Sequence, residues 1–190
     1  METSGSPFLS RIRRQNPGKK LKLYCGDEMR FGQQTIITKR YAIKGSSPRV
    51  VVQGGFKCSN IIGFSSPQDG DKCVSISEKL NVKVIQKHVN KFSKRLDKDV
   101  IAVVILDNAG YHKSPKLKWP NNVVPWFVPP YSPELNPAER PWHYIKNNYL
   151  NGTLYKNMKE IRRKGYAAWA KLSAELIKSL TRTPLVKMFD

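Results

Sequence analysis

Apolar residues at every second position predict that the first part of the chain is built mainly from β-strands. The stretch LKLYCGD (21–27) shows this alternation clearly, with Leu21, Leu23 and Cys25 on one side. We expect further strands over QTIIT, RVVVQGG and SNIIGFSS, the last one after the turn signal Gly54-Gly55.

Two longer segments follow the period of an amphipathic helix. The first is predicted from about Ser75 to Leu96, where Ser75 and Glu78 have the spacing of a capping box. The second is predicted from about Asn157 to Leu180. Lysines and arginines lie opposite its apolar stripe, and this basic face is either a DNA contact or a solvated surface.

Between these segments, the continuously apolar run VIAVVIL (100–106) is typical of a strand that is buried on both faces of a sheet. NNVVPWFVPP (121–130) predicts one more strand, which its final prolines end. A shorter helix is expected from about Pro137 to Tyr149. This order implies an α/β domain with a mixed sheet covered by helices.

The net charge of the chain indicates a class of binding partner. The 190 residues include 34 lysines and arginines but only 14 acidic residues, which gives a net charge of +20. Such a balance attracts polyanions and makes nucleic acid the first partner to consider, with a merely soluble surface as the alternative. Residues 1–20 are polar and basic and are interpreted as a tail or linker.

The sequence contains no feature of a secreted or membrane protein. Its three cysteines are widely spaced and form no CxxC pair, so neither a disulfide framework nor a zinc ribbon is indicated. The N-terminus lacks the apolar region of a signal peptide, and the longest apolar run is too short to cross a bilayer. We therefore expect a soluble, intracellular protein that has no membrane partner.

Three carboxylates are singled out by their positions. Asp27 is expected to end the first strand, Asp107 to end the buried strand, and Glu139 to lie in the first turn of a helix. Sites in open α/β sheets gather at the C-terminal ends of strands. Neighbouring carboxylates repel one another, and divalent cations relieve that repulsion; oxygen ligands favour Mg²⁺ or Mn²⁺. Two such ions can cleave a phosphodiester.

Each carboxylate also has a plainer interpretation. Asp27 and Asp107 are common turn residues, and Glu139 stands where a capping box would place it behind Asn136 and Pro137. Only the three acids together favour a metal site.

The roles of two further side chains near these acids stay open. His112, five residues after Asp107, could polarise a phosphate or a water, or it could be structural or exposed. Pro141 lies inside the predicted helix, where it would remove one hydrogen bond. The five prolines of PPYSPELNPAERPW (129–142) are expected to fix a rigid path that aims Glu139 at the other two acids.

The segments YCGDEMRFG, VVILDNAGYHKS and VPPYSPELNPAERPWHYIK resemble the catalytic domain of DDE transposases, closest to the mariner superfamily and its bacterial insertion-sequence relatives. The resemblance implies an RNase H-like fold in which Asp27, Asp107 and Glu139 are the catalytic acids that hold two Mg²⁺ or Mn²⁺ ions. Glu28 matches a common "DE" pair of the family and is not assigned to the metal. The implied activity is cleavage at element ends followed by strand transfer into target DNA.

The resemblance also implies a domain organisation and partners. Residues 21–150 would form the catalytic domain, 1–20 a linker remnant, and 151–190 a helical extension packed on the same domain. Full-length relatives carry helix-turn-helix modules before the catalytic domain, so a homodimer and a separate helix-turn-helix polypeptide are candidate partners beside DNA. A bacterial protein would be cytoplasmic at the nucleoid, and a eukaryotic one nuclear.

Two alternatives stay open at this point. The chain could be a basic DNA-binding remnant of a truncated element without catalysis, or a general RNase H-like nuclease that acts on RNA–DNA hybrids.

Overall fold

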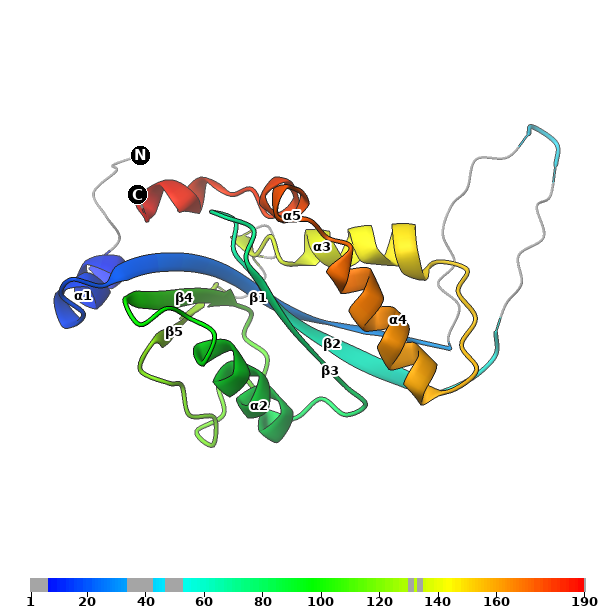
Figure 1. Ribbon diagram of the computed structural model, residues 1–190, viewed down its shortest axis with the longest axis horizontal. Helices are drawn as coiled ribbons and strands as arrows, with labels where there is room; N and C mark the ends of the chain where they lie inside the picture. Colours follow the sequence, from blue (N-terminus) through cyan, green and yellow to red (C-terminus); the bar gives the residue numbers. More distant parts are fainter. Residues whose placement is uncertain (1–6, 34–42, 47–52, 130–131, 133–134, 190) are drawn as a thin grey trace.

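A mixed five-stranded sheet forms the centre of the computed structural model, which describes residues 7–33, 43–46, 53–129, 132 and 135–189 (Figure 1). Its order is β3-β2-β1-β4-β5; β1 pairs in parallel with β4 and antiparallel with β2. The strands are β1 (Lys20–Gly32), β2 (Cys58–Ser65), β3 (Lys72–Ser77), β4 (Val100–Leu106) and β5 (Val123–Phe127). All seven residues of β4 are buried, as its apolar run predicts.

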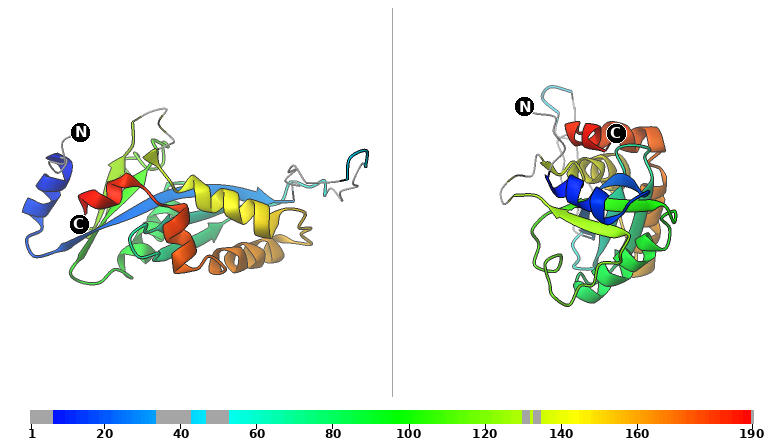
Figure 2. Two further views of the ribbon diagram at one scale, coloured as in Figure 1. Left: turned by 90° about the horizontal axis from the view of Figure 1, so that it is seen from above. Right: turned by 90° about the vertical axis from the view of Figure 1, so that its left-hand side faces the viewer.

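Helices cover both faces of this sheet, which confirms the predicted α/β class. Helix α2 lies on one face, and α3, α4 and α5 lie on the other (Figure 1 and Figure 2). The helices are α1 (Pro7–Gln15), α2 (Val82–Ser93), α3 (Glu139–Ile145), the π-helical turn η2 (Lys146–Leu150), α4 (Met158–Ala170), α5 (Ala174–Leu180) and the 3₁₀ helix η3 (Pro184–Met188). None of the helices in these described ranges is long and apolar enough to cross a bilayer.

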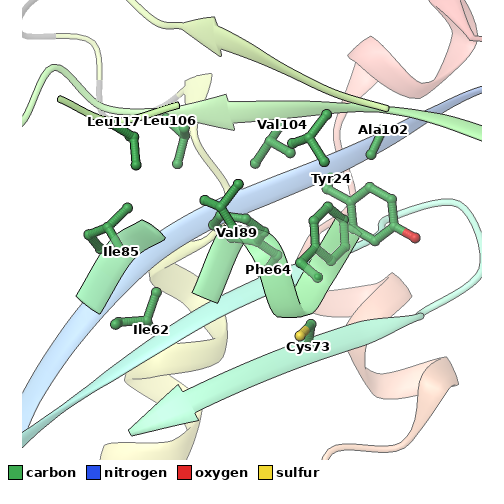
Figure 3. Close-up of a cluster of buried hydrophobic side chains, with 12 residues drawn as sticks. Tyr24, Ile62, Phe64, Cys73, Ile85, Val89, Ala102, Val104, Leu106 and Leu117 are labelled. Carbon is green, nitrogen blue, oxygen red and sulfur yellow. The ribbon is translucent and has the colours of Figure 1, made fainter. Parts of the chain in front are cut away.

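The core under α2 is aromatic and aliphatic. Ile85 and Val89 of α2 point at the sheet (Figure 3). The buried Phe92 ring makes T-shaped contacts with Tyr24 and Phe64, at centroid distances of 4.7 and 5.1 Å. This packing holds β1 and β2 from one side, beneath the strand segment that carries Asp27.

On the opposite face, Gly63 of β2 allows two tryptophans to approach the sheet closely. The rings of Trp142 in α3 and Trp169 in α4 lie 4.9 Å apart, and a Cβ added at Gly63 would stand 2.5 and 2.7 Å from them. Gly63 is the antiparallel partner of Asp27. The missing side chain therefore lets α3 lie against the sheet directly beside Asp27.

The helix predicted from Ser75 to Leu96 is wrong at its start. Ser75 belongs to β3, and α2 begins only at Val82, after Asn81, whose side chain accepts a hydrogen bond from the Val84 N–H. Pairing of β3 with β2 outweighs the local capping pattern, because it satisfies a whole row of backbone groups.

The C-terminal segment is helical but is not one helix. Ser173 caps a new helix by accepting a hydrogen bond from the Leu176 N–H, and this separates α5 from α4. The Lys72 ammonium stabilises the break from the other side by donating to carbonyls at and just after the end of α4, those of Trp169, Ala170 and Leu172.

Other predictions concern the N-terminal half. Residues 7–15 form helix α1 rather than a polar tail, because Leu9 and Ile12 are buried in a core that also contains Phe189. The strand predicted over QTIIT (34–38) lies outside the described residues, as do 49–52 of RVVVQGG; residues 53–55 are not in a strand. The strands over 21–27, 59–66, 100–106 and 121–130 are confirmed within their main parts.

Replacing Gly63 by alanine tests whether this close approach holds α3 in place. We expect Gly63→Ala to lower the free energy of unfolding by about 1–3 kcal/mol, because the new methyl group overpacks the two indoles. Urea unfolding measures the loss, and Gly54→Ala is the matched control, since a Cβ there meets nothing within 4 Å. Equal stability of the two variants would contradict the close approach.

Candidate active site

The parallel pairing of β1 with β4 brings Asp27 and Asp107 together. Cys25 is the register partner of Ile105, and continuing that register by two residues places Asp27 beside Asp107. Asp107 follows the last residue of β4, as predicted. Asp27 does not end its strand: β1 continues to Gly32 along β2, and only the pairing with β4 stops before Asp27.

Glu139 reaches the same region because the start of α3 is tied to β1. Asn136 is buried; its Nδ2 donates to the Gly26 carbonyl at 3.0 Å, and its Oδ1 accepts from the Ala138 N–H at 3.2 Å. Gly26 immediately precedes Asp27. One amide side chain therefore links the entry of α3 to the strand position that carries the first acid.

The helix containing Glu139 begins two residues later than predicted. Its first residue is Glu139 itself, and in the described part of the chain no hydrogen bond joins Glu139 to Asn136, so the structure contains no capping box here. Pro141 then falls in the first turn, where backbone N–H groups have no intrahelical partner, and it removes no hydrogen bond. Residues 130–131 and 133–134 of the proline-rich approach lie outside the described residues.

An open cleft of about 410 Å³ lies between Asp27 and Glu139. Its lining also includes Glu28, Met29, Arg30, Trp142, His143 and Lys146. Among the residues that the structure describes, no three His, Cys, Asp or Glu side chains stand close enough to enclose one ion without further movement. The cleft is thus acidic at its base and bears cationic or polar side chains around it.

The pKa of Asp27 responds to both of the other predicted acids. Burial raises the pKa of Asp27, and the negative charges of Glu28, Asp107 and Glu139 raise it further, to about 7. The Glu28 N–H, which donates to Asp27 Oδ1 at 2.7 Å, only partly opposes this shift. Asp27 is therefore under like-charge repulsion from the acids around it.

His112 is hydrogen-bonded to two of these acids. Its Nδ1 lies 2.9 Å from Asp107 Oδ1, and its Nε2 lies 3.1 Å from Glu28 Oε1. Burial alone would lower the pKa of His112, but these two carboxylates outweigh it and raise that pKa to about 9. The same hydrogen bond is the main cause that lowers the pKa of Asp107. His112 is therefore not an exposed side chain.

Sequence reasoning missed the partners of Glu28. Its Oε2 accepts from the Tyr111 hydroxyl at 2.8 Å, so Glu28, Tyr111 and His112 form one buried group. The available signal was the alternation of β1, which turns Glu28 to the opposite face from Asp27. His143, four residues after Glu139, lines the cleft but has no part in this group.

Comparisons with known proteins cover most of the chain. The sequence model of the DDE superfamily endonuclease family matches residues 22–162, which include all three acids. The uncharacterized protein y4pE/y4sA of Sinorhizobium fredii (strain NBRC 101917 / NGR234) is 37% identical over 112 residues, 59% of this chain and 83% of that protein.

Solved structures share the fold at low sequence identity. The Mos1 transposase paired-end complex with left transposon end has a TM-score of 0.64 at 13% identity, covering 95% of this chain and 56% of that one. The Mos1 mariner paired end complex with Mn has a TM-score of 0.62 at 16% identity, covering 96% and 57%. The chain thus spans little more than half the length of these transposases.

The structural likeness confirms the predicted RNase H-like fold, and the match to the family covers the strands, the loop after β4 and α3. The chain therefore belongs to the DDE superfamily endonucleases.

Proposed function

We infer that this chain is the catalytic domain of a DNA transposase, which cleaves phosphodiesters at the ends of an element and joins the freed 3′-hydroxyl to target DNA. The observation that carries this proposal is that the strand register places Asp27 beside Asp107, that Asp27 shares a cleft with Glu139, and that the negative charges of both other acids raise the pKa of Asp27. The similarity to Mos1 complexes that contain transposon ends supports DNA as the substrate.

The acids fit divalent cations. A half-buried carboxylate whose pKa is raised to about 7 by burial and by neighbouring negative charges is a group that a cation relieves, and its oxygen ligands suit Mg²⁺ or Mn²⁺. Asp27, Asp107 and Glu139 would hold two such ions; the related Mos1 complexes are described with Mn and with Mg. When bound, the ions would activate the attacking oxygen and neutralise charge on the phosphate.

Basic side chains around the cleft would hold and orient the DNA. Arg30 and Lys146 line the same cleft as Glu139 and can contact phosphate oxygens, which fixes the strand without reading its sequence. The net charge of +20 extends this attraction over the whole molecule and makes binding strongly dependent on salt. A homodimer and a separate helix-turn-helix polypeptide belong to this proposal as partners that would select the element ends.

Replacing Asp107 by asparagine tests the catalytic role of the acids. We expect Asp107→Asn to reduce Mn²⁺-dependent nicking of supercoiled plasmid by about 100-fold or more, because a neutral amide cannot provide the charge that holds the cation. Asp97→Asn, at an exposed acid just before β4, is the matched control and should cleave like the wild type. Nicking that is equal in both variants, or that resists EDTA, would refute the proposed function.

A DNA-binding remnant would behave differently in a second assay. The catalytic domain should gain thermal stability from Mn²⁺, because an ion that binds only the folded state stabilises it. A remnant would retard DNA in a gel and show no such gain, and cleavage of RNA–DNA hybrids in preference to duplex DNA would point to the nuclease alternative.

The raised pKa of Asp27 predicts how metal-free stability depends on pH. The folded protein keeps the Asp27 proton up to about pH 7, whereas the unfolded chain releases it near pH 4. Between these values the folded state binds more protons, so stability falls as pH rises. We expect a loss of about 2 kcal/mol from this carboxylate between pH 5 and 7 in EDTA.

In urea unfolding at pH 5, 6 and 7, the free energy of unfolding of Asp27→Asn should not show this loss. The window lies above the ordinary pKa of Asp107, whose lowered pKa gives a stabilising effect that is complete by pH 5. The same pH slope in the wild type and in Asp27→Asn would show that Asp27 is not under this repulsion.

A further inference from the structure

Glu28 is a buried acid next to the catalytic cluster, and both of its oxygens already have partners. Glu28 borders the cleft, but only 6% of its side chain is exposed. Oε1 lies 3.1 Å from His112 Nε2, and Oε2 accepts from the Tyr111 hydroxyl at 2.8 Å. Binding an ion through Glu28 would leave a buried imidazole or phenol without its partner, which is unfavourable.

His112 uses its other nitrogen to hold one particular oxygen of Asp107. The His112 side chain is 1% exposed, and Nδ1 lies 2.9 Å from Asp107 Oδ1. The Ala109 N–H donates to that same Oδ1 at 3.1 Å. Asp107 Oδ2 takes part in none of the hydrogen bonds or ion pairs found among the described residues, and the Asp107 side chain is 54% exposed. One oxygen of Asp107 is thus anchored by two hydrogen bonds, and the other has no bonding partner among the described residues.

We propose that Glu28 and His112 are a positioning pair for Asp107: Glu28 fixes the imidazole ring, and the ring fixes Asp107 Oδ1 so that Oδ2 is presented to the reacting phosphate site. This inference rests on the proposed function, and it assigns Glu28 and His112 roles that act only through Asp107. Neither residue touches the DNA or the reacting atoms.

Both nitrogens of the His112 ring take part in this arrangement, and each lies within hydrogen-bond distance of a different carboxylate. Fixing an acid that holds a cation through a histidine and a second carboxylate is a common way to orient such groups, and losing the outer partner typically weakens metal binding or activity about 10–100-fold.

Two substitutions at His112 separate its two hydrogen bonds. The amide nitrogen of asparagine can take roughly the place of Nδ1, next to Asp107, while that of glutamine can take roughly the place of Nε2, next to Glu28. In a Mn²⁺ titration followed by thermal stability, we expect His112→Gln to raise the half-maximal Mn²⁺ concentration about 10–100-fold. His112→Asn keeps the bond to Asp107 and loses only the one to Glu28, so its half-maximal Mn²⁺ concentration should lie clearly below that of His112→Gln.

Controls distinguish positioning from general loss of folding. His88 is the other buried histidine, bonded through Nδ1 to Ser75 on the α2 side of the sheet, and His88→Gln should leave the Mn²⁺ requirement unchanged. Affinity of the His112 variants for DNA should also equal that of the wild type. Equal Mn²⁺ requirements of His112→Asn and His112→Gln, or a requirement that falls in His112→Gln, would overturn the proposal.

A double-mutant cycle tests the pair without metal or catalysis. Glu28→Gln and Asp107→Ala should shift the melting temperature non-additively by about 2–4 °C, although Glu28 and Asp107 meet only through His112. The matched cycle of Glu28→Gln with Asp97→Ala should be additive. Additive shifts in the first cycle would overturn the positioning pair. If the wild type neither binds Mn²⁺ nor cleaves DNA, the proposed function fails, and this cycle still decides the pair.

Discussion

Asp27 and Asp107 lie side by side because β1 and β4 pair in parallel with Cys25 opposite Ile105. The pairing is fixed by burial: β4 is apolar on both faces, and a slip of one residue would turn every side chain of β1 to the wrong face. Beyond this pairing, β1 continues along β2 alone, so Asp27 is both held by a strand and free of β4. The site begins where the parallel ladder ends.

The third acid depends on packing rather than on strand register. Glu139 opens a helix whose entry is bonded through Asn136 to Gly26, and whose Trp142 rests over the bare backbone of Gly63. These two contacts flank Asp27, one on its own strand and one on the neighbouring strand. The position of α3 therefore follows from a buried amide and a missing Cβ, and both are small features within a largely apolar interface.

Prediction from sequence succeeded where a local pattern and the tertiary structure agree. The apolar run before Asp107 gave both the buried strand and its end, and the alternation before Asp27 gave the strand beside it. The pattern failed where tertiary packing decides: Ser75 joins β3 instead of a helix, and Leu9 is buried although residues 1–20 as a whole are polar and basic. The length of β1 past Asp27 is likewise set by β2, which no local signal in the strand reveals.

The hydrogen bonds around the acids were beyond sequence reasoning for a different reason. That Glu28 would face away from Asp27 follows from strand alternation, but that the loop after Asp107 folds back to place Tyr111 and His112 against Glu28 depends on contacts across more than eighty residues. Asn136 is a similar case, since its local role at the helix entry was foreseeable and its bond to Gly26 was not.

The negative charges of the acids are compensated unequally. The imidazolium of His112 sits between Asp107 and Glu28 and relieves the repulsion felt by those two acids. Nothing in the described residues does the same for Asp27, whose pKa rises to about 7 for that reason together with burial. Asp107 is therefore ionised and oriented, whereas the repulsion around Asp27 stays uncompensated. If the proposed function holds, a cation would find one ligand already fixed and would relieve the other, which would couple folding of the site to the binding of metal.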